Sequence, residues 1–149
     1  MAVVDNNILD EITWLNRQLV YLRDTFITWI REEGHEVDVS EENVINNEEL
    51  SGKYNTFKYT LILDKTIKIC IIPYAIWIVA AKGRIDISGP SGFEKLIYLQ
   101  KSENNIEKST LNKFNTINEE GWYWYDDSTI RKMVKLSKEM FGYLLGRLQ

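Results

Sequence analysis

Four charged residues near the middle of the sequence are of the types that chemistry on a phosphorylated ligand requires. Arg84 and Asp86 lie two positions apart, and Glu94 and Lys95 follow them across a glycine-containing turn. Carboxylates can hold metal ions or transfer protons, and the two cations can bind phosphate. These four residues form one candidate site, either catalytic or phosphate-binding.

The spacing within this cluster argues against catalysis. Metal-dependent nucleases of the restriction-endonuclease type carry an acidic residue on one strand and a Glu-x-Lys pattern on the next. Here Glu94 and Lys95 are adjacent, so a strand directs their side chains to opposite faces. Arg84 and Asp86 share a face, and ion pairing across neighbouring strands accounts for them more simply. We therefore favour a protein that is not an enzyme.

One histidine and one cysteine limit the other kinds of site. His35 lies far along the sequence from Cys70, whereas zinc sites need several such ligands close together. The Gly-Pro-Ser-Gly run at 89–92 lacks the lysine and the strand-to-helix context of a phosphate-binding loop, so it predicts a hairpin turn. The sequence thus predicts no metal site and no cofactor.

The aromatic run at 122–125 is a better candidate for a binding surface. Successive residues of a strand face opposite sides, so either its two tryptophans or its two tyrosines leave the core. Tryptophan and tyrosine dominate the energetics of protein interfaces, and several cations follow directly in the sequence. The predicted binding residues are Tyr123, Tyr125, Arg131, Lys132 and Lys135.

Two helices are expected to flank the strands that carry these residues. Over residues 7–33, apolar positions step by four and three, and further apolar residues widen the stripe. A wide stripe favours a helix that lies on a sheet, whereas a narrow one favours a coiled coil. Pairing of two copies through helix 8–33 stays open as an alternative. The second helix is expected at 138–148, after a serine that can cap it.

Between the helices, apolar and polar residues alternate in short runs, which is typical of antiparallel strands. Two-residue links join several runs, so neighbouring strands must be antiparallel. On the fifth run we expect Phe93, Ile97 and Leu99 to face the core. The expected strands are 55–63, 66–72, 75–81, 84–88, 93–100 and 121–125.

Three segments show no clear strand alternation. Residues 35–52 are acidic and polar, and we expect a solvated connection with a short strand near 37–39. Residues 101–120 predict either a long loop or a short helix at 108–115. Residues 129–136 predict a helix that follows the aromatic strand.

Together these elements predict an α+β fold in a single domain, residues 1–149. A long N-terminal helix precedes an antiparallel meander of about five to six strands, and a C-terminal helix follows. Each helix has one apolar stripe and the sheet has one mostly apolar face. We therefore expect both helices to pack on the same sheet face.

The composition narrows the cellular setting. Of the 149 residues, 44% are hydrophobic and 27% charged, as in ordinary globular domains. The net charge of −4 argues against general nucleic-acid binding. A lone cysteine fits a reducing compartment, and the sequence shows neither a signal peptide nor an apolar run that could span a membrane. We expect a cytoplasmic protein without membrane association. Isoleucine, asparagine and lysine are abundant and have AT-rich codons, which suggests a bacterial or phage origin.

These observations favour a non-enzymatic binding or regulatory module, of an inhibitor or immunity type, that holds a protein partner on its aromatic and basic surface. The alternative is an enzyme or sensor that takes a nucleotide or another small phosphorylated ligand through Arg84, Asp86, Glu94 and Lys95. A pocket lined by the two cations would favour the alternative. A flat patch of tryptophan and tyrosine would favour the binding module.

Overall fold

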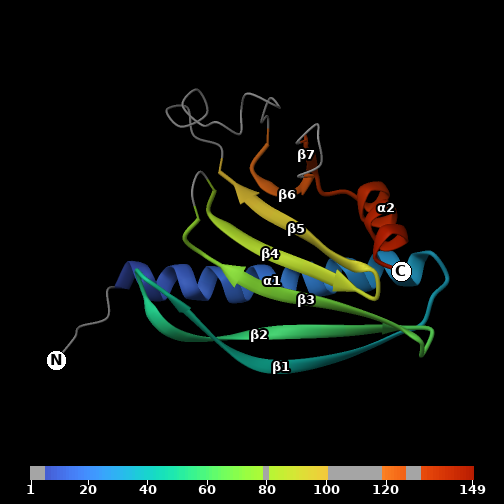
Figure 1. Ribbon diagram of the computed structural model, residues 1–149, viewed down its shortest axis with the longest axis horizontal. Coiled ribbons are helices and arrows are strands. Elements are labelled where there is room, and N and C mark those ends of the chain that lie inside the picture. Colours follow the sequence, from blue (N-terminus) through green and yellow to red (C-terminus); the bar gives the residue numbers. More distant parts are fainter. Residues whose placement is uncertain (1–5, 79–80, 101–118, 127–131) are drawn as a thin grey trace.

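The computed structural model describes residues 6–78, 81–100, 119–126 and 132–149. Within these residues, two helices and seven strands follow one another in sequence (Figure 1). They are α1 (Asn6–Glu32), β1 (Val37–Glu48), β2 (Gly52–Leu63), β3 (Ile67–Ala75), β4 (Gly83–Gly89), β5 (Gly92–Leu99), β6 (Gly121–Asp126), β7 (Lys132–Lys135) and α2 (Lys138–Leu148).

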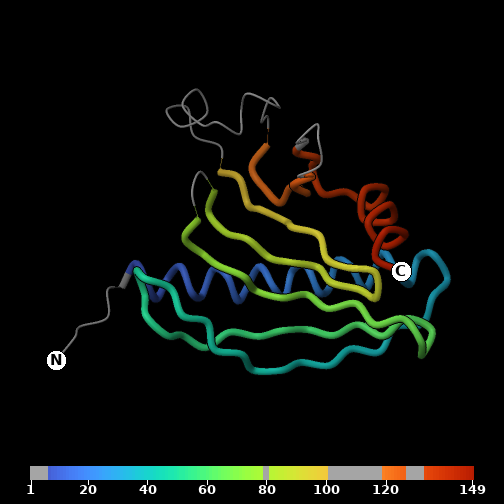
Figure 2. The backbone as a smooth tube through the Cα atoms, viewed as in Figure 1, coloured from blue at the N-terminus to red at the C-terminus, as the bar shows by residue number. Residues whose placement is uncertain are grey.

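The strands form one antiparallel sheet in which each strand pairs with its neighbours in sequence, in the order β1 to β7. The tube in Figure 2 follows this meander from the long β1–β2 hairpin to β6 and β7. Helix α1 runs along the sheet, and α2 lies near its β4–β5 end (Figure 1). The predicted α+β fold, with helices packed on an antiparallel sheet, is confirmed.

The apolar stripe of α1 is the centre of the core. Its five innermost side chains are at most 1% exposed, and they follow the predicted spacing of three and four residues. The helix packs mainly against β2 and β3. The stripe therefore faces the sheet, as its width indicated. The five residues are Leu15, Leu19, Leu22, Phe26 and Ile30.

Helix α2 closes one end of this core. The ring of Phe141 stacks on that of Phe26 with centroids 4.1 Å apart. Ser137 caps the helix, because its hydroxyl accepts a hydrogen bond from the backbone N–H of Met140. The C-terminal end lies so close to β4 that a side chain at Gly89 would meet the carbonyl oxygen of Leu148. Glycine at this position is therefore a packing requirement.

The sheet has a second, smaller apolar cluster on the face away from the helices, formed by Ile97, Leu99, Tyr123 and Met133. The expectation that Phe93, Ile97 and Leu99 face the main core was wrong. Cross-strand partners share a face, and the register pairs Ile85 of β4 with Leu96 of β5. Because Ile85 is in the main core, Leu96 joins it, and its odd-numbered neighbours face the other side.

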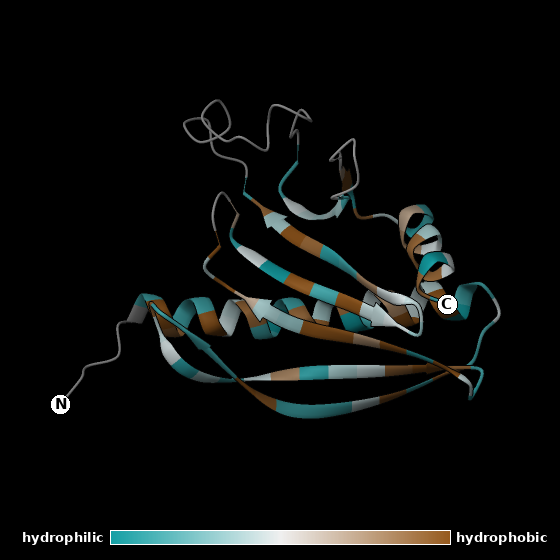
Figure 3. Cartoon of the chain, viewed as in Figure 1, coloured by the Kyte–Doolittle hydropathy of each residue, from teal (hydrophilic) through white to brown (hydrophobic). Residues whose placement is uncertain are grey.

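The acidic segment at 35–52 is mostly strand rather than a solvated connection. All twelve residues of β1 pair with β2 without a register shift, from Val37 opposite Leu63 to Glu48 opposite Gly52. Figure 3 shows the predominance of polar residues along this outermost strand. An edge strand can carry such residues because backbone pairing to one neighbour holds it and both faces reach water.

Two predicted elements differ from those observed. The strand expected at 75–81 is absent from its described part, because β3 continues through Pro73 to Ala75 and pairs directly with β4, with a register shift between these two residues. Such irregularities admit proline within a sheet. The prediction of a helix at 129–136 was also wrong, because residues 132–135 form strand β7, which pairs with β6. Residues 127–131 and 101–118 lie outside the described residues.

The side chain of Glu48 fastens the tip of the β1–β2 hairpin to the segment after β3. Its carboxylate accepts hydrogen bonds from the backbone N–H groups of Ile76, at 3.1 and 3.2 Å, and Trp77, at 3.2 Å. It also accepts a hydrogen bond from the hydroxyl of Tyr54. Burial and this bond raise the pKa of Tyr54 well above its ordinary range. One carboxylate thus satisfies three donors.

Replacing Leu19 with alanine should lower the free energy of unfolding by about 2–5 kcal/mol, because the fully buried side chain leaves a cavity under the helix. Chemical denaturation measures this loss. Arg17→Ala on the exposed side of the same helix is the control. Equal losses in the two variants would contradict the assigned face.

Replacing Glu48 with alanine should lower the free energy of unfolding by about 1–3 kcal/mol, because two backbone donors lose their acceptor. The matched control is Glu49→Ala, which removes an exposed carboxylate from the neighbouring residue. Thermal or chemical unfolding of both variants compares the losses. The anchoring role fails if Glu49→Ala costs as much as Glu48→Ala.

Candidate functional site

The candidate site lies on the sheet face opposite the helices, which we call the open face. The register brings Asp86, Lys95 and Tyr125 side by side on β4, β5 and β6. One row away lie Ser88 and Phe93, also on the open face by strand alternation. Neighbouring side chains on this part of the face lie about 4.8 Å apart across the strands and about 7 Å apart along each strand.

Three aromatic rings on this face each lie beside a cation. The guanidinium carbon of Arg84 is 3.7 Å from the ring centre of Tyr74. The ammonium of Lys95 is 5.9 Å from the ring centre of Tyr125. The third pair joins the ammonium of Lys135 and the ring of Tyr123, at 5.3 Å. Such contacts fix the direction of the rings and cations together.

The rings differ in how far they reach solvent. Tyr74 is 54% exposed and Phe93 55% exposed, whereas Tyr125 is half-buried. Tyr123 is only 6% exposed and belongs to the smaller apolar cluster. We define the open-face patch as Tyr74, Arg84, Phe93, Lys95 and Tyr125. Tyr123 lies beside the patch as support for it.

Arg84 and Asp86 neutralise each other within β4. The Nε of Arg84 donates to Asp86 at 2.8 Å and its Nη2 at 3.1 Å, which is a two-point contact. Both side chains are largely buried, at 19% and 13% exposed. Ion pairing of these residues was predicted across strands, but it forms along one strand. The guanidinium is therefore already committed to one carboxylate.

Glu94 points to the helix side of the sheet, away from the other three residues of the predicted catalytic cluster. Its carboxylate accepts hydrogen bonds from the indole N–H of Trp124 at 2.9 Å and from Arg147 at 3.0 Å. Lys95, Arg84 and Asp86 stay on the open face. Among the described residues, no three His, Cys, Asp or Glu side chains gather as metal ligands would.

The predicted binding residues are therefore only partly together. Of the two alternatives for the aromatic strand, the tryptophans enter the main core and Tyr123 and Tyr125 take the open face. Lys135 lies at the end of β7 beside Tyr123, and Lys132 begins that strand. Arg131 is outside the described residues.

Sequence reasoning missed two members of the patch. Phe93 was assigned to the core face, but the register with β4 turns the odd-numbered positions of β5 to the open face. Tyr74 follows Pro73, where the strand was expected to end, so no face was assigned to it. A strand drawn through the proline would have placed Tyr74 on the face of Ile72.

Two cavities of about 510 Å³ each lie along the flank of α1 and share the side chain of Trp29. The first also lies against Arg17, Tyr98, Trp122 and Lys135. Lys135 donates to the carbonyl oxygen of Glu120 and lies 4.0 Å from the carboxylate of Glu119, so its charge is partly neutralised.

Comparison with known proteins adds no relative: no protein family, no curated protein and no solved structure matches this chain. Neither described helix is apolar enough over a sufficient length to cross a membrane.

Stability should fall as the pH rises above about 10, the ordinary pKa of tyrosine. Burial raises the pKa of Tyr98 and of Tyr123, and the contact of Tyr98 with Glu120 raises its pKa further. A raised pKa in the folded state means that the neutral rings stabilise the fold below pH 10 and lose this effect above it. Tyr98→Phe should flatten this decline, as denaturant titrations at about pH 9 and pH 11 would show. An unchanged decline would contradict the role of Tyr98.

Proposed function

We propose that this protein is a non-enzymatic binding module that holds a protein partner against the open-face patch. The observation that carries the proposal is the concentration of Tyr74, Phe93 and Tyr125 on one face of the sheet, with Arg84 and Lys95 among them. Aromatic residues and arginine supply most of the binding energy at protein interfaces.

A rigid sheet suits this task. Cross-strand pairing fixes the backbone of β4, β5 and β6, and the neighbouring cations restrict the rings of Tyr74 and Tyr125. Little side-chain freedom then remains to be lost when a partner binds. The patch spans about 14 Å in each direction by strand and row spacing, less than a standard interface of about 800 Å² per partner. It would thus be the central anchor of a larger contact.

The two remaining proposals have less support. A phosphorylated ligand would have to compete with Asp86 for Arg84, and Glu94 faces the other side of the sheet. Pairing of two copies through helix 8–33 would have to use residues outside the buried stripe, such as Leu9 and Tyr21, which are about half exposed. An inhibitor or immunity role in the cytoplasm of a bacterial or phage-infected cell belongs to the proposal as its biological setting.

The test compares a double variant, Phe93→Ala with Tyr125→Ala, against wild type and Tyr21→Ala. Tyr21 is 57% exposed on α1, so its truncation removes a similar ring from a different surface. Tagged proteins recover partners from extracts of the organism that encodes the chain, and the recovered partner is then titrated. The double variant should lose at least about 2 kcal/mol of binding free energy, roughly 30-fold in Kd.

Circular dichroism and the unfolding midpoint must first show that all three proteins are folded. The partner should bind wild type and Tyr21→Ala equally. Unchanged binding by the folded double variant, or loss of binding by Tyr21→Ala, would reject the open-face patch as the contact surface.

A further inference from the structure

The two edges of the sheet differ in how they are protected against further strand pairing. Within the described part of the chain, β1 pairs only with β2 and β7 only with β6. Strand β7 is four residues long and has a lysine at each end. Short length and lysine are two ordinary devices that keep an edge from pairing with another chain.

Strand β1 has neither device. It is twelve residues long, contains no proline or lysine, and keeps an unbroken register with β2. In an antiparallel pair every second residue turns its N–H and C=O away from the neighbour, so about six residues of β1 offer both groups outward. The outer edge is thus a regular template for one more strand.

The side chains of β1 add two features to this edge. Val39 and Ile45 are 50% and 68% exposed, so the strand also offers apolar contacts. All the charged residues of β1 are acidic, namely Asp38, Glu41, Glu42 and Glu48. Two copies of β1 side by side would bring like charges together, which disfavours self-pairing. An added strand that carries lysine or arginine would instead be attracted.

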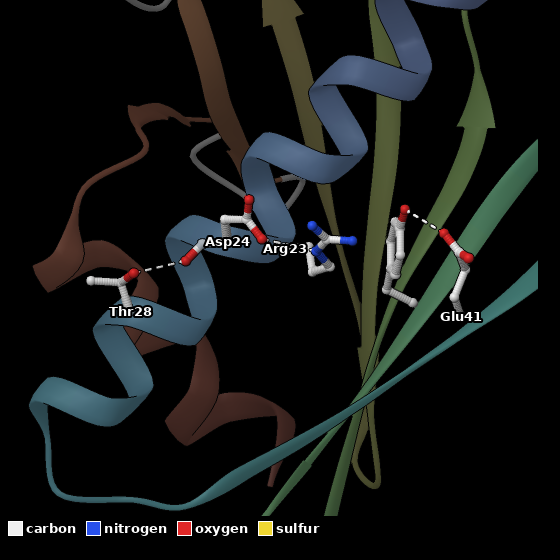
Figure 4. A network of polar contacts seen from close by, with 5 residues as sticks. Arg23, Asp24, Thr28 and Glu41 are labelled. Atoms are coloured by element: carbon white, nitrogen blue, oxygen red, sulfur yellow. Dashed lines mark hydrogen bonds and ion pairs between the residues drawn. The ribbon is translucent and has the colours of Figure 1, made fainter.

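Contacts behind the edge hold the strand in place. Glu41 accepts a hydrogen bond from the hydroxyl of Tyr59 at 2.9 Å, and the guanidinium of Arg23 lies 4.9 Å from that ring (Figure 4). Glu42 forms an exposed ion pair with Lys58 at 3.3 Å, and its side chain stays 66% exposed. The partners of Glu41 and Glu42 come from α1 and β2, whereas Asn46 and Glu48 at the far end of β1 bond to the segment from Pro73 to Trp77.

We propose that the outer edge of β1 binds an extended basic segment of another protein by strand addition. Backbone hydrogen bonds would supply affinity for an extended segment of any sequence. The carboxylates of Asp38 and Glu42 would favour segments that carry lysine and arginine. This surface is separate from the open-face patch, and the proposal does not depend on it.

The test uses a fluorescent nine-residue peptide of alternating lysine with valine or threonine as the probe. Two control peptides match it: one carries N-methyl groups on alternate amides, and one has glutamate in place of lysine. Anisotropy at low ionic strength should show binding of the lysine peptide, about tenfold weaker binding of the N-methylated peptide and none of the glutamate peptide. Alternate amides of β1 should also gain protection from hydrogen exchange.

Protein variants then locate the contact. The double variant Asp38→Asn with Glu42→Gln should weaken binding about five- to tenfold. The control Asp10→Asn with Glu139→Gln removes two carboxylates from the helices and should leave binding unchanged. No binding, equal binding of the N-methylated or glutamate peptide, or an unaffected double variant would overturn the proposal. So would a dimer of the protein alone with protected β1 amides, because a second copy would then occupy the edge.

Discussion

The packing of α1 on the sheet is the contact on which the rest of this structure depends. Five side chains of one helical stripe are at most 1% exposed and share one core cluster with residues of β2 to β6. Removing that surface from water supplies the main favourable free energy. It also decides which sheet face is covered, and therefore leaves the opposite face of β3 to β6 available for the open-face patch. The second helix adds Phe141 to the same core, where the Phe141 ring stacks on that of Phe26.

The open face is a consequence of this one-sided covering, whereas the outer edge follows from the terminal position of β1 in the strand order. An antiparallel sheet with one solvated face alternates buried and exposed residues, and its exposed positions are free to carry recognition residues. The smaller apolar cluster around Ile97 and Tyr123 stiffens this face without help from the described helices. The charged residues that suggest catalysis in the sequence form local contacts instead. Asp86 pairs with Arg84, and Glu94 accepts hydrogen bonds from Trp124 and Arg147.

The fold class could be predicted because the helical stripe and the strand alternation are local patterns that burial reinforces. The main errors have tertiary causes. The alternation of β5 is ambiguous because both of its faces are apolar, and only the register with β4 decides which enters the core. Strand β1 has no apolar face that would reveal it in the sequence, because backbone pairing with β2 holds it in the sheet. Residues 132–135 read as helix, but pairing with β6 makes them strand. The patch could be predicted in part, because Tyr125 lies in a conspicuous aromatic run. Tyr74 could be placed only by recognising that the strand continues through Pro73.

The meander has a consequence for synthesis of the chain. Each strand pairs with a neighbour that is made shortly before or after it, so the sheet can grow hairpin by hairpin. Helix α1 is made before the sheet, yet its contacts reach far ahead: Gln18 accepts a hydrogen bond from the indole of Trp122, 104 residues later. At translation rates of about 5–20 residues per second, this partner follows roughly 5–20 s afterwards. During that interval the apolar stripe of a nascent α1 has only part of its sheet to cover it, so the stripe stays partly exposed to water until the later strands are made.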